Sequence, residues 1–119
     1  MFLVDSHCHL DMLDTAVSGN LTEVLSRAKE QGVGHILNVC VTLTDFPNVL
    51  AIAENDPNIS ASVGLHPNEQ SEDVVTAGEL IALAQHKKVI AIGETGLDYY
   101  RTPPDSEWQR ARFREHIRA

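Results

Sequence analysis

An apolar run typical of a β-strand is followed by a helix-like segment four times along this chain. The strand-like runs cover residues 2–7, 35–41, 59–65 and 89–92. Helix-like segments follow over residues 20–31, from Thr44 onward, over residues 72–86 and from Ser106 onward. Because parallel strands need a long crossover that is usually helical, this alternation predicts an α/β fold with a parallel sheet covered by helices.

The helix-like segments carry start and stop signals of their own. Apolar residues recur at helical spacing over residues 20–31, and Gly32 is placed to end that helix. Thr44 is placed to cap the second helix. Ser106 and Gln109 have the spacing of a capping box, which predicts that the fourth helix begins there.

Two architectures fit four βα units: an open doubly wound sheet, or part of an eight-stranded barrel. The chain of 119 residues is long enough for one core and too short for two. Its last residues, 116–119, still follow the helical pattern and contain no glycine or proline. We therefore expect residues 1–119 to form a single domain, the N-terminal half of a barrel, truncated within its fourth helix.

Composition excludes several classes of protein. The apolar run at residues 1–4 is too short for a signal peptide, and no later run could span a membrane, so we expect a cytoplasmic protein with no membrane partner. A formal charge of −8 argues against a broad nucleic-acid surface. Five of the nine basic residues nevertheless lie in residues 101–119.

The two cysteines, Cys8 and Cys40, lie inside apolar, strand-like runs. Their separation and the absence of further cysteines do not suit a disulfide framework or a zinc-binding pair. We expect two buried, reduced thiols.

Asp5, His7 and His9 stand at alternate positions near the end of the first strand. On an extended strand these side chains share one face, so two imidazoles can bind one divalent ion with little backbone cost. Asp5 is expected to support the two histidines without binding the ion itself. Taken alone, the same pair also fits two partly solvated loop histidines.

Two later strand ends favour the metal interpretation. The third strand ends at Gly64-Leu65-His66-Pro67, and the fourth ends at Gly93-Glu94. In α/β folds the carboxyl ends of parallel strands face the crevice in which chemistry takes place. A glutamate there would be costly in a closed, apolar environment. We predict that His7, His9 and Glu94 bind metal together.

Other polar residues near this edge allow more than one role. His66 contacts substrate or supports the site, or else closes a turn before Pro67. Asp98 orients a ligand, holds water or caps a turn. Tyr99 and Arg101 contact a base and a phosphate, or are a packed tyrosine and a solvated arginine. The remaining histidines, expected to be structural and away from this edge, are His35, His86 and His116.

Three ordered motifs resemble one known family. Asp5-Ser6-His7-Cys8-His9, residues 64–67 (Gly-Leu-His-Pro) and residues 93–100 (Gly-Glu-Thr-Gly-Leu-Asp-Tyr-Tyr) are similar in order and spacing to the TatD family of metal-dependent deoxyribonucleases. That family belongs to a hydrolase superfamily of (β/α)8 TIM-type barrels. The resemblance covers essentially the whole chain, and Trp108-Gln109-Arg110 with Phe113 also suits it.

The resemblance implies a function and a site. It implies that His7 and His9 bind one divalent ion, that Glu94 bridges two ions and acts in catalysis, and that His66 contributes to the site. Two further histidines and an aspartate would come from later strands outside this chain. Two ions, Mg²⁺, Mn²⁺ or Zn²⁺, would lower the pKa of an attacking water and stabilise charge on a phosphodiester of DNA.

The resemblance also separates branches of the superfamily. Relatives that deaminate or open rings often bridge their metals with a modified lysine from the fourth strand, where this chain has Glu94. The carboxylate favours a phosphoesterase that trims DNA ends.

Two alternatives stay open. One is hydrolysis of another ester, such as that of a D-aminoacyl-tRNA. The other is a non-catalytic half-barrel fragment that binds one metal weakly through His7 and His9. The open edges of its first and fourth strands could then drive self-association.

Overall fold

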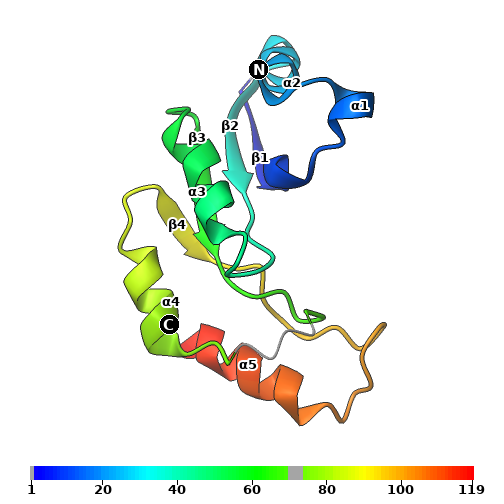
Figure 1. Cartoon of the computed structure of the whole chain (residues 1–119), viewed down its shortest axis with the longest axis vertical. Coiled ribbons are helices and arrows are strands. Elements are labelled where there is room, and N and C mark those ends of the chain that lie inside the picture. Colours follow the sequence, from blue (N-terminus) through cyan, green and yellow to red (C-terminus); the bar gives the residue numbers. More distant parts are fainter. Residues whose placement is uncertain (1, 70–73) are drawn as a thin grey trace.

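A computed structural model describes residues 2–69 and 74–119, and Figure 1 shows its arrangement. Within these residues, no helix has the length and apolar character needed to cross a membrane. The strands and helices are, in chain order, β1 (Leu3–Cys8), the 3-10 helix η1 (Leu10–Met12), α1 (Thr15–Ser18), α2 (Leu21–Glu30), β2 (Val33–Asn38), α3 (Phe46–Glu54), β3 (Ile59–Val63), α4 (Ala77–Ala84), β4 (Val89–Ile92) and α5 (Glu107–Arg118).

The four strands form one parallel sheet in the order β1-β2-β3-β4. Each strand is therefore hydrogen-bonded to the next one along the chain, as in consecutive units of a βα barrel. All four strand arrows in Figure 1 point toward the end of the molecule where α5 lies. The predicted α/β architecture is confirmed, and the carboxyl ends of the strands meet at one edge.

The core lies between the centre of the sheet and α3. Every residue of β3 is buried, and Ile59, Ala61 and Val63 alternate toward the apolar cluster. From α3, Val49 and Ala53 are fully buried in the same cluster. In contrast, most of β1 is exposed and β4 is only partly covered. The two central strands, β2 and β3, are thus more deeply buried than the two edge strands.

The first half of the chain follows the predicted helix signals in part. The Asn20 side chain and Glu23 form a capping box at the start of α2, and Gly32 adopts a φ of +90° just after its end. The prediction that Thr44 caps the next helix was wrong. Asp45 is the N-cap residue of α3, and its backbone amide is bound by Thr42 Oγ1 at 3.0 Å.

The second half departs further from the predicted boundaries. The expected start of the third helix, at residue 72, lies outside the described residues, and residues 74–76 are not helical. Instead, the Thr76 side chain accepts a hydrogen bond from the Glu79 amide and begins α4. Ser106 does precede α5, but the predicted capping box was wrong, because Gln109 points its side chain into the protein.

Polar side chains inside the fold join the strand ends. Asn38 is fully buried; its Oδ1 accepts the Leu10 amide at 2.8 Å and its Nδ2 donates to Val49 O at 3.3 Å. Ser62 Oγ accepts the Cys40 amide at 3.1 Å and donates to Gly93 O at 2.6 Å. Since these groups are bonded, their burial costs little and they specify how neighbouring strand ends are aligned.

The backbones after β3 and β4 approach so closely that only glycine fits between them. A Cβ atom built on Gly64 would lie 2.6 Å from the carbonyl carbon of Gly93 and 2.7 Å from its oxygen. No real Cβ contact is this short, so a side chain at residue 64 would push the two strand ends apart.

We predict that Gly64→Ala lowers the free energy of unfolding by about 1–3 kcal/mol, as overpacking does. The matched control is Gly78→Ala in α4, where an added Cβ meets nothing within 4 Å. That substitution should instead stabilise the helix by about 0.5–1 kcal/mol. Urea unfolding of the two variants measures the difference, and equal effects would contradict the close approach.

Candidate metal centre

His7, His9 and Glu94 bring three ligand atoms to one place. His7 Nε2 and His9 Nε2 lie 3.2 Å apart. Glu94 Oε2 lies 3.3 Å from the first nitrogen and 3.6 Å from the second. All three atoms fall within 4.8 Å of one another, a grouping that could hold one metal ion.

The two histidines converge because the chain turns sharply after β1. His9 follows the last residue of the strand and caps η1, and the next residue, Leu10, is buried and bound through its amide to Asn38. His9 Nδ1 lies 3.0 Å from Val39 O, a carbonyl that can only accept, so the ring proton is on Nδ1. The lone pair of Nε2 is thereby left for a cation, the arrangement typical of histidine ligands.

Glu94 reaches the histidines because the chain after β4 crosses toward the end of β2. Gly93 N donates to Val63 O at 2.8 Å, and Glu94 N donates to Cys40 O at 2.9 Å. The Ser62 hydroxyl holds the Gly93 carbonyl from the other side. The backbone that leads into the glutamate is thus fixed by three hydrogen bonds.

His66 lies on the far side of the same carboxylate. Its Nε2 is 3.5 Å from Glu94 Oε1, while the histidine pair faces Oε2. The Asn68 amide donates to His66 Nδ1 at 3.1 Å, so the proton of the neutral ring is on Nε2. In this geometry His66 offers the carboxylate a hydrogen-bond donor and offers no lone pair to an ion beside it.

The donor set fits a divalent cation. Two imidazole nitrogens and a carboxylate oxygen are ligands that Zn²⁺ and Mn²⁺ accept. Two ring nitrogens 3.2 Å apart with lone pairs toward a common point repel each other unless a proton or a cation lies between them. The His7 side chain is 51% exposed, so an ion could enter and keep positions open to water or substrate. The metal roles of these residues stay a prediction.

Asp5 is linked to the histidine pair by a hydrogen bond to the backbone of His7. Its Oδ1 accepts a hydrogen bond from His7 N at 3.2 Å, which supports the strand end that carries the histidine. The expected supporting role is compatible with this contact, although no ring nitrogen is involved in it.

The Asp98 carboxylate braces the loop between β4 and α5. Its Oδ1 accepts the amides of Tyr100 and Arg101 at 3.0 and 3.2 Å, and its Oδ2 is bound by Asn68 Nδ2. Desolvation opposes ionisation, but the hydrogen bonds from Arg101 N, Tyr100 N and Asn68 outweigh it and lower the pKa of Asp98. Of the roles considered for Asp98, the geometry favours the turn cap, and its contact with substrate stays a prediction.

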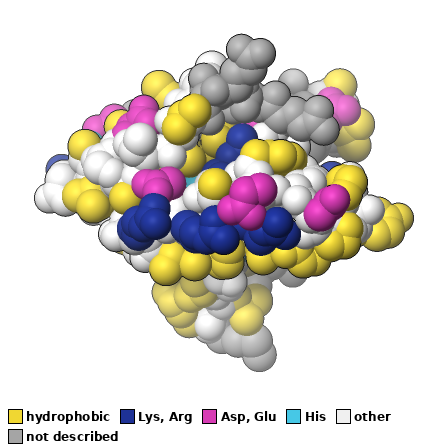
Figure 2. All heavy atoms as spheres, turned by 90° about the horizontal axis from the view of Figure 1, so that it is seen from below, with side chains coloured by type: hydrophobic (Ala, Val, Ile, Leu, Met, Phe, Trp, Pro, Cys, Tyr) yellow, Lys and Arg dark blue, Asp and Glu magenta, His cyan; other side chains and the backbone are white. Residues whose placement is uncertain are grey.

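Tyr99 and Arg101 lie in this loop and are exposed. Figure 2, viewed from the end where α5 lies, shows basic side chains in a row with acidic ones beside them. On α5, Glu107 pairs with Arg110 and Arg114, and Glu115 pairs with Arg118. The positive charges of the paired arginines on α5 are therefore partly neutralised. The substrate contacts expected of Tyr99 and Arg101 stay predictions.

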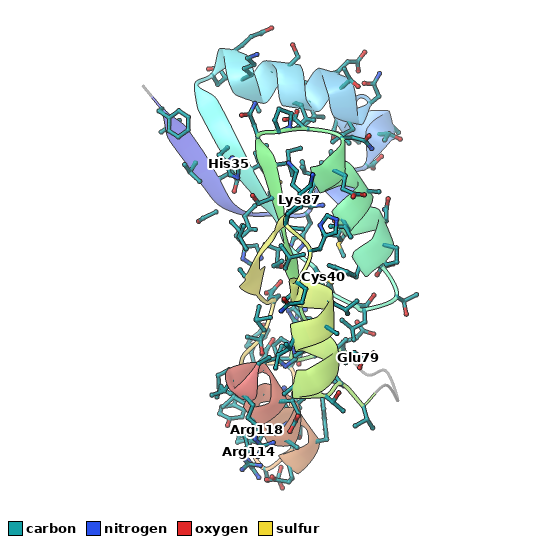
Figure 3. The ribbon with its side chains drawn as sticks, turned by 90° about the vertical axis from the view of Figure 1, so that its left-hand side faces the viewer. His35, Cys40, Glu79, Lys87, Arg114 and Arg118 are labelled. Atoms are coloured by element: carbon teal, nitrogen blue, oxygen red, sulfur yellow. The ribbon has the colours of Figure 1, made fainter. Side chains whose placement is uncertain are left out.

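Two histidines lie outside the site, as expected. His35, labelled on β2 in Figure 3, lies far from Arg114 and Arg118 of α5, and its Nε2 is 2.9 Å from Ser60 Oγ. His86 Nε2 lies 3.1 Å from Glu54 Oε1.

The cysteines were predicted in part. Both thiols are free, but Cys40 is buried whereas Cys8 is only partly so. Burial raises the pKa of the Cys40 thiol to about 11, so it stays protonated and unreactive.

Sequence reasoning missed four buried polar residues that shape the site. One expectation was also wrong: His116 is close to the strand ends, because its Nε2 accepts the Leu65 amide at 2.9 Å. The sequence signal that could have identified all four residues is a polar side chain at a position where strand or helix periodicity predicts burial. The four residues are Asn38, Ser62, Gln109 and His116.

Successive parallel βα units with imidazoles and a carboxylate at the strand carboxyl ends are typical of one half of a TIM-type barrel, and here they carry a candidate metal centre. The family model described as "TatD related DNase" matches residues 4–119. The chain belongs to this family.

Individual relatives agree with this assignment. A Buchnera aphidicola protein described as an uncharacterized metal-dependent hydrolase is 39% identical over 119 residues, which are 99% of this chain and 45% of that protein. YcfH of Escherichia coli K12, with the same description, is 40% identical over 98% of this chain and 44% of its own length. The chain thus spans about half the length of these curated relatives.

A solved structure has the same fold. The crystal structure of YjjV, a TatD homologue from E. coli K12, superimposes with a TM-score of 0.82 at 36% identity, covering 97% of this chain and 45% of that one. The expectation that this chain forms about half of a TIM-type barrel is confirmed in its architecture.

We predict that His7→Ala combined with His9→Ala abolishes tight Mn²⁺ or Zn²⁺ binding, because two of the three convergent ligand atoms are lost. Isothermal calorimetry on the purified chain measures the affinity. His86→Ala, which removes a histidine outside the site, is the control and should bind as the unaltered chain does. Unchanged affinity in the double variant would remove the central claim about this site.

Proposed function

We propose that this chain contributes part of the metal site of a hydrolase that cleaves phosphodiester bonds of DNA, removing nucleotides from the ends. The observation that carries the proposal is the convergence of His7, His9 and Glu94 at the carboxyl ends of parallel strands. Membership of the family described as TatD-related DNases supports the choice of substrate.

Divalent ions bound here would lower the pKa of an attacking water and offset the charge that develops on a phosphodiester. The chain itself supplies groups suited to that task. Glu94 turns one oxygen toward the histidine pair and the other toward His66, so a single carboxylate spans the site. This arrangement agrees with the bridging role that the family resemblance implies.

His66 is suited to bind a developing negative charge. Its Nε2 lies 3.5 Å from Glu94 Oε1, beside the candidate metal centre, and the Asn68 amide keeps the proton on that nitrogen. A neutral imidazole held in this way can donate to a non-bridging phosphate oxygen without having to change its protonation.

The charge of the chain also suits a metal-dependent reaction on DNA. With a net charge of −8, the protein would repel a polyanion unless bound cations offset part of that charge. Exposed Tyr99 and Arg101, in the loop that follows Glu94, would contact a base and a phosphate near the cleaved bond.

The site would require two ions and further ligands from strands beyond this chain, which is about half as long as its relatives. We also expect a cytoplasmic location, because Cys8 and Cys40 are free thiols that a reducing compartment would preserve.

We predict that Glu94→Gln in the complete protein lowers kcat for DNA hydrolysis by about 100-fold or more, the scale expected when a carboxylate of a metal site is lost. Glutamine keeps the size of the side chain and removes its charge. Glu79→Gln on α4, an acid outside the site that Figure 3 labels, is the control and should leave turnover unchanged.

The assay compares single-stranded DNA with a D-aminoacyl-tRNA. Release of nucleotides from DNA supports the proposal. Deacylation of the tRNA without cleavage of DNA would reassign the site to another ester, and near-normal cleavage by Glu94→Gln would assign Glu94 a structural role.

A further inference from the structure

We propose that the inward face of α5 positions His66 for catalysis, by holding the backbone of residues 65–69 through Gln109, Arg112 and His116. This inference rests on the proposed function for its catalytic consequence. The three residues are separated by three and four positions, so they lie along one face of the helix.

Gln109 joins the loop after β3 to the loop after β4. It is fully buried, and its Nε2 donates to Pro67 O at 3.2 Å and to Asp98 O at 3.4 Å. Its Oε1 accepts the Asp98 amide at 2.9 Å. A single amide side chain therefore satisfies backbone groups of both loops, one residue from His66.

His116 holds the residue on the other side of His66. Its Nε2 accepts the Leu65 amide at 2.9 Å, so the ring proton is on Nδ1, which donates to Arg112 O at 2.9 Å. Burial lowers the pKa of His116, which keeps the ring neutral and its Nε2 able to accept.

Arg112 binds the same loop at two carbonyl oxygens. Its Nη1 donates to His66 O at 3.2 Å and also to Glu69 O. The guanidinium lies over the Trp108 ring, 4.9 Å from its centroid, which limits its movement. A charged group that binds carbonyl oxygens in this way fixes the direction of the backbone.

The hydrogen bonds from α5 affect the His66 imidazole by way of the backbone. With residues 65–69 held on both sides of His66, the Asn68 amide stays within hydrogen-bonding distance of His66 Nδ1. That bond keeps the proton on Nε2, which faces Glu94. The hydrogen bonds of Gln109 and His116 go to Pro67, Asp98, Leu65 and Arg112, and not to Glu94 or the histidine pair, so we assign their effect on the site to His66.

If these residues only stabilised the fold, apolar side chains of similar size would do so at a lower free-energy cost of burial. Burying a glutamine or a histidine costs free energy unless every polar atom is bonded, and an apolar residue of similar size carries no such cost. Here the bonds go mainly to loop backbone that carries the residues of the site. Such a pattern specifies one conformation of those loops.

The test uses Gln109→Met and His116→Phe, which keep volume and remove the hydrogen bonds, and His116→Gln, which restores an acceptor for Leu65 N. In the 119-residue chain we expect the amides of Leu65 and Asn68 to exchange with deuterium faster in the first two variants. Exchange in the third should be close to that of the unaltered chain. Mn²⁺ affinity should stay the same in all three, because His7, His9 and Glu94 are not held by α5.

A double-mutant cycle in the complete protein tests the catalytic consequence. Gln109→Met should lower kcat by about 100-fold, as small misplacements of catalytic groups do. The same substitution should have little effect in a His66→Ala background, because its effect passes through His66. Additive losses would overturn the proposal, and so would a loss of Mn²⁺ affinity in parallel with activity.

The exchange experiment stands apart from the question of substrate. If the unaltered protein cleaves no DNA, the proposed function fails, while faster exchange at Leu65 and Asn68 with unchanged Mn²⁺ affinity still supports the role of α5. Unchanged exchange in both Gln109→Met and His116→Phe would overturn that role. Should these variants not fold, Arg112→Met, at a half-buried position, removes the bonds to His66 O and Glu69 O and should likewise speed exchange at Asn68.

Discussion

The Glu94 carboxylate lies between the His7–His9 pair and His66, and the rest of the site depends on its placement. One oxygen faces His7 and His9 from the end of β1, and the other faces His66 from the end of β3. Strand β4 is not next to β1 in the sheet, so the chain after it must cross toward β2. The close approach of the Gly64 and Gly93 backbones accompanies that crossing.

The buried core and the exposed strand edges lie in different parts of the fold. The buried strand β3 and helix α3 form the core, whereas β1 and β4 are edge strands with exposed faces. In a closed barrel such edges pair with neighbouring strands, and self-association of this chain through them stays a prediction. The strand ends that carry the site are nevertheless joined by side-chain hydrogen bonds from the interior, such as those of Ser62.

Much of the fold could be predicted from periodicity alone. Apolar runs located all four strands, and β4 matched its predicted range of residues 89–92, although β1 is mostly exposed and β4 is only partly covered in this chain. The grouping of His7, His9 and Glu94 followed from the rule that parallel strand ends share one edge. Helix starts were less predictable: α3 begins after Asp45 without any capping bond from a side chain, so the polar residue at Thr44 did not mark its start. The roles of Gln109 and His116 depend on tertiary contacts with loops some 40 to 50 residues away, which no local pattern records.

The most direct test of this account is the anomalous X-ray signal of a crystal of the protein grown with Mn²⁺. The account predicts a peak within coordination distance of His7 Nε2, His9 Nε2 and Glu94 Oε2, because these atoms already converge. It also predicts that His66 is directed at the carboxylate and does not bind this ion. Absence of a peak there at saturating Mn²⁺, or a peak elsewhere on the chain, would contradict the central claim.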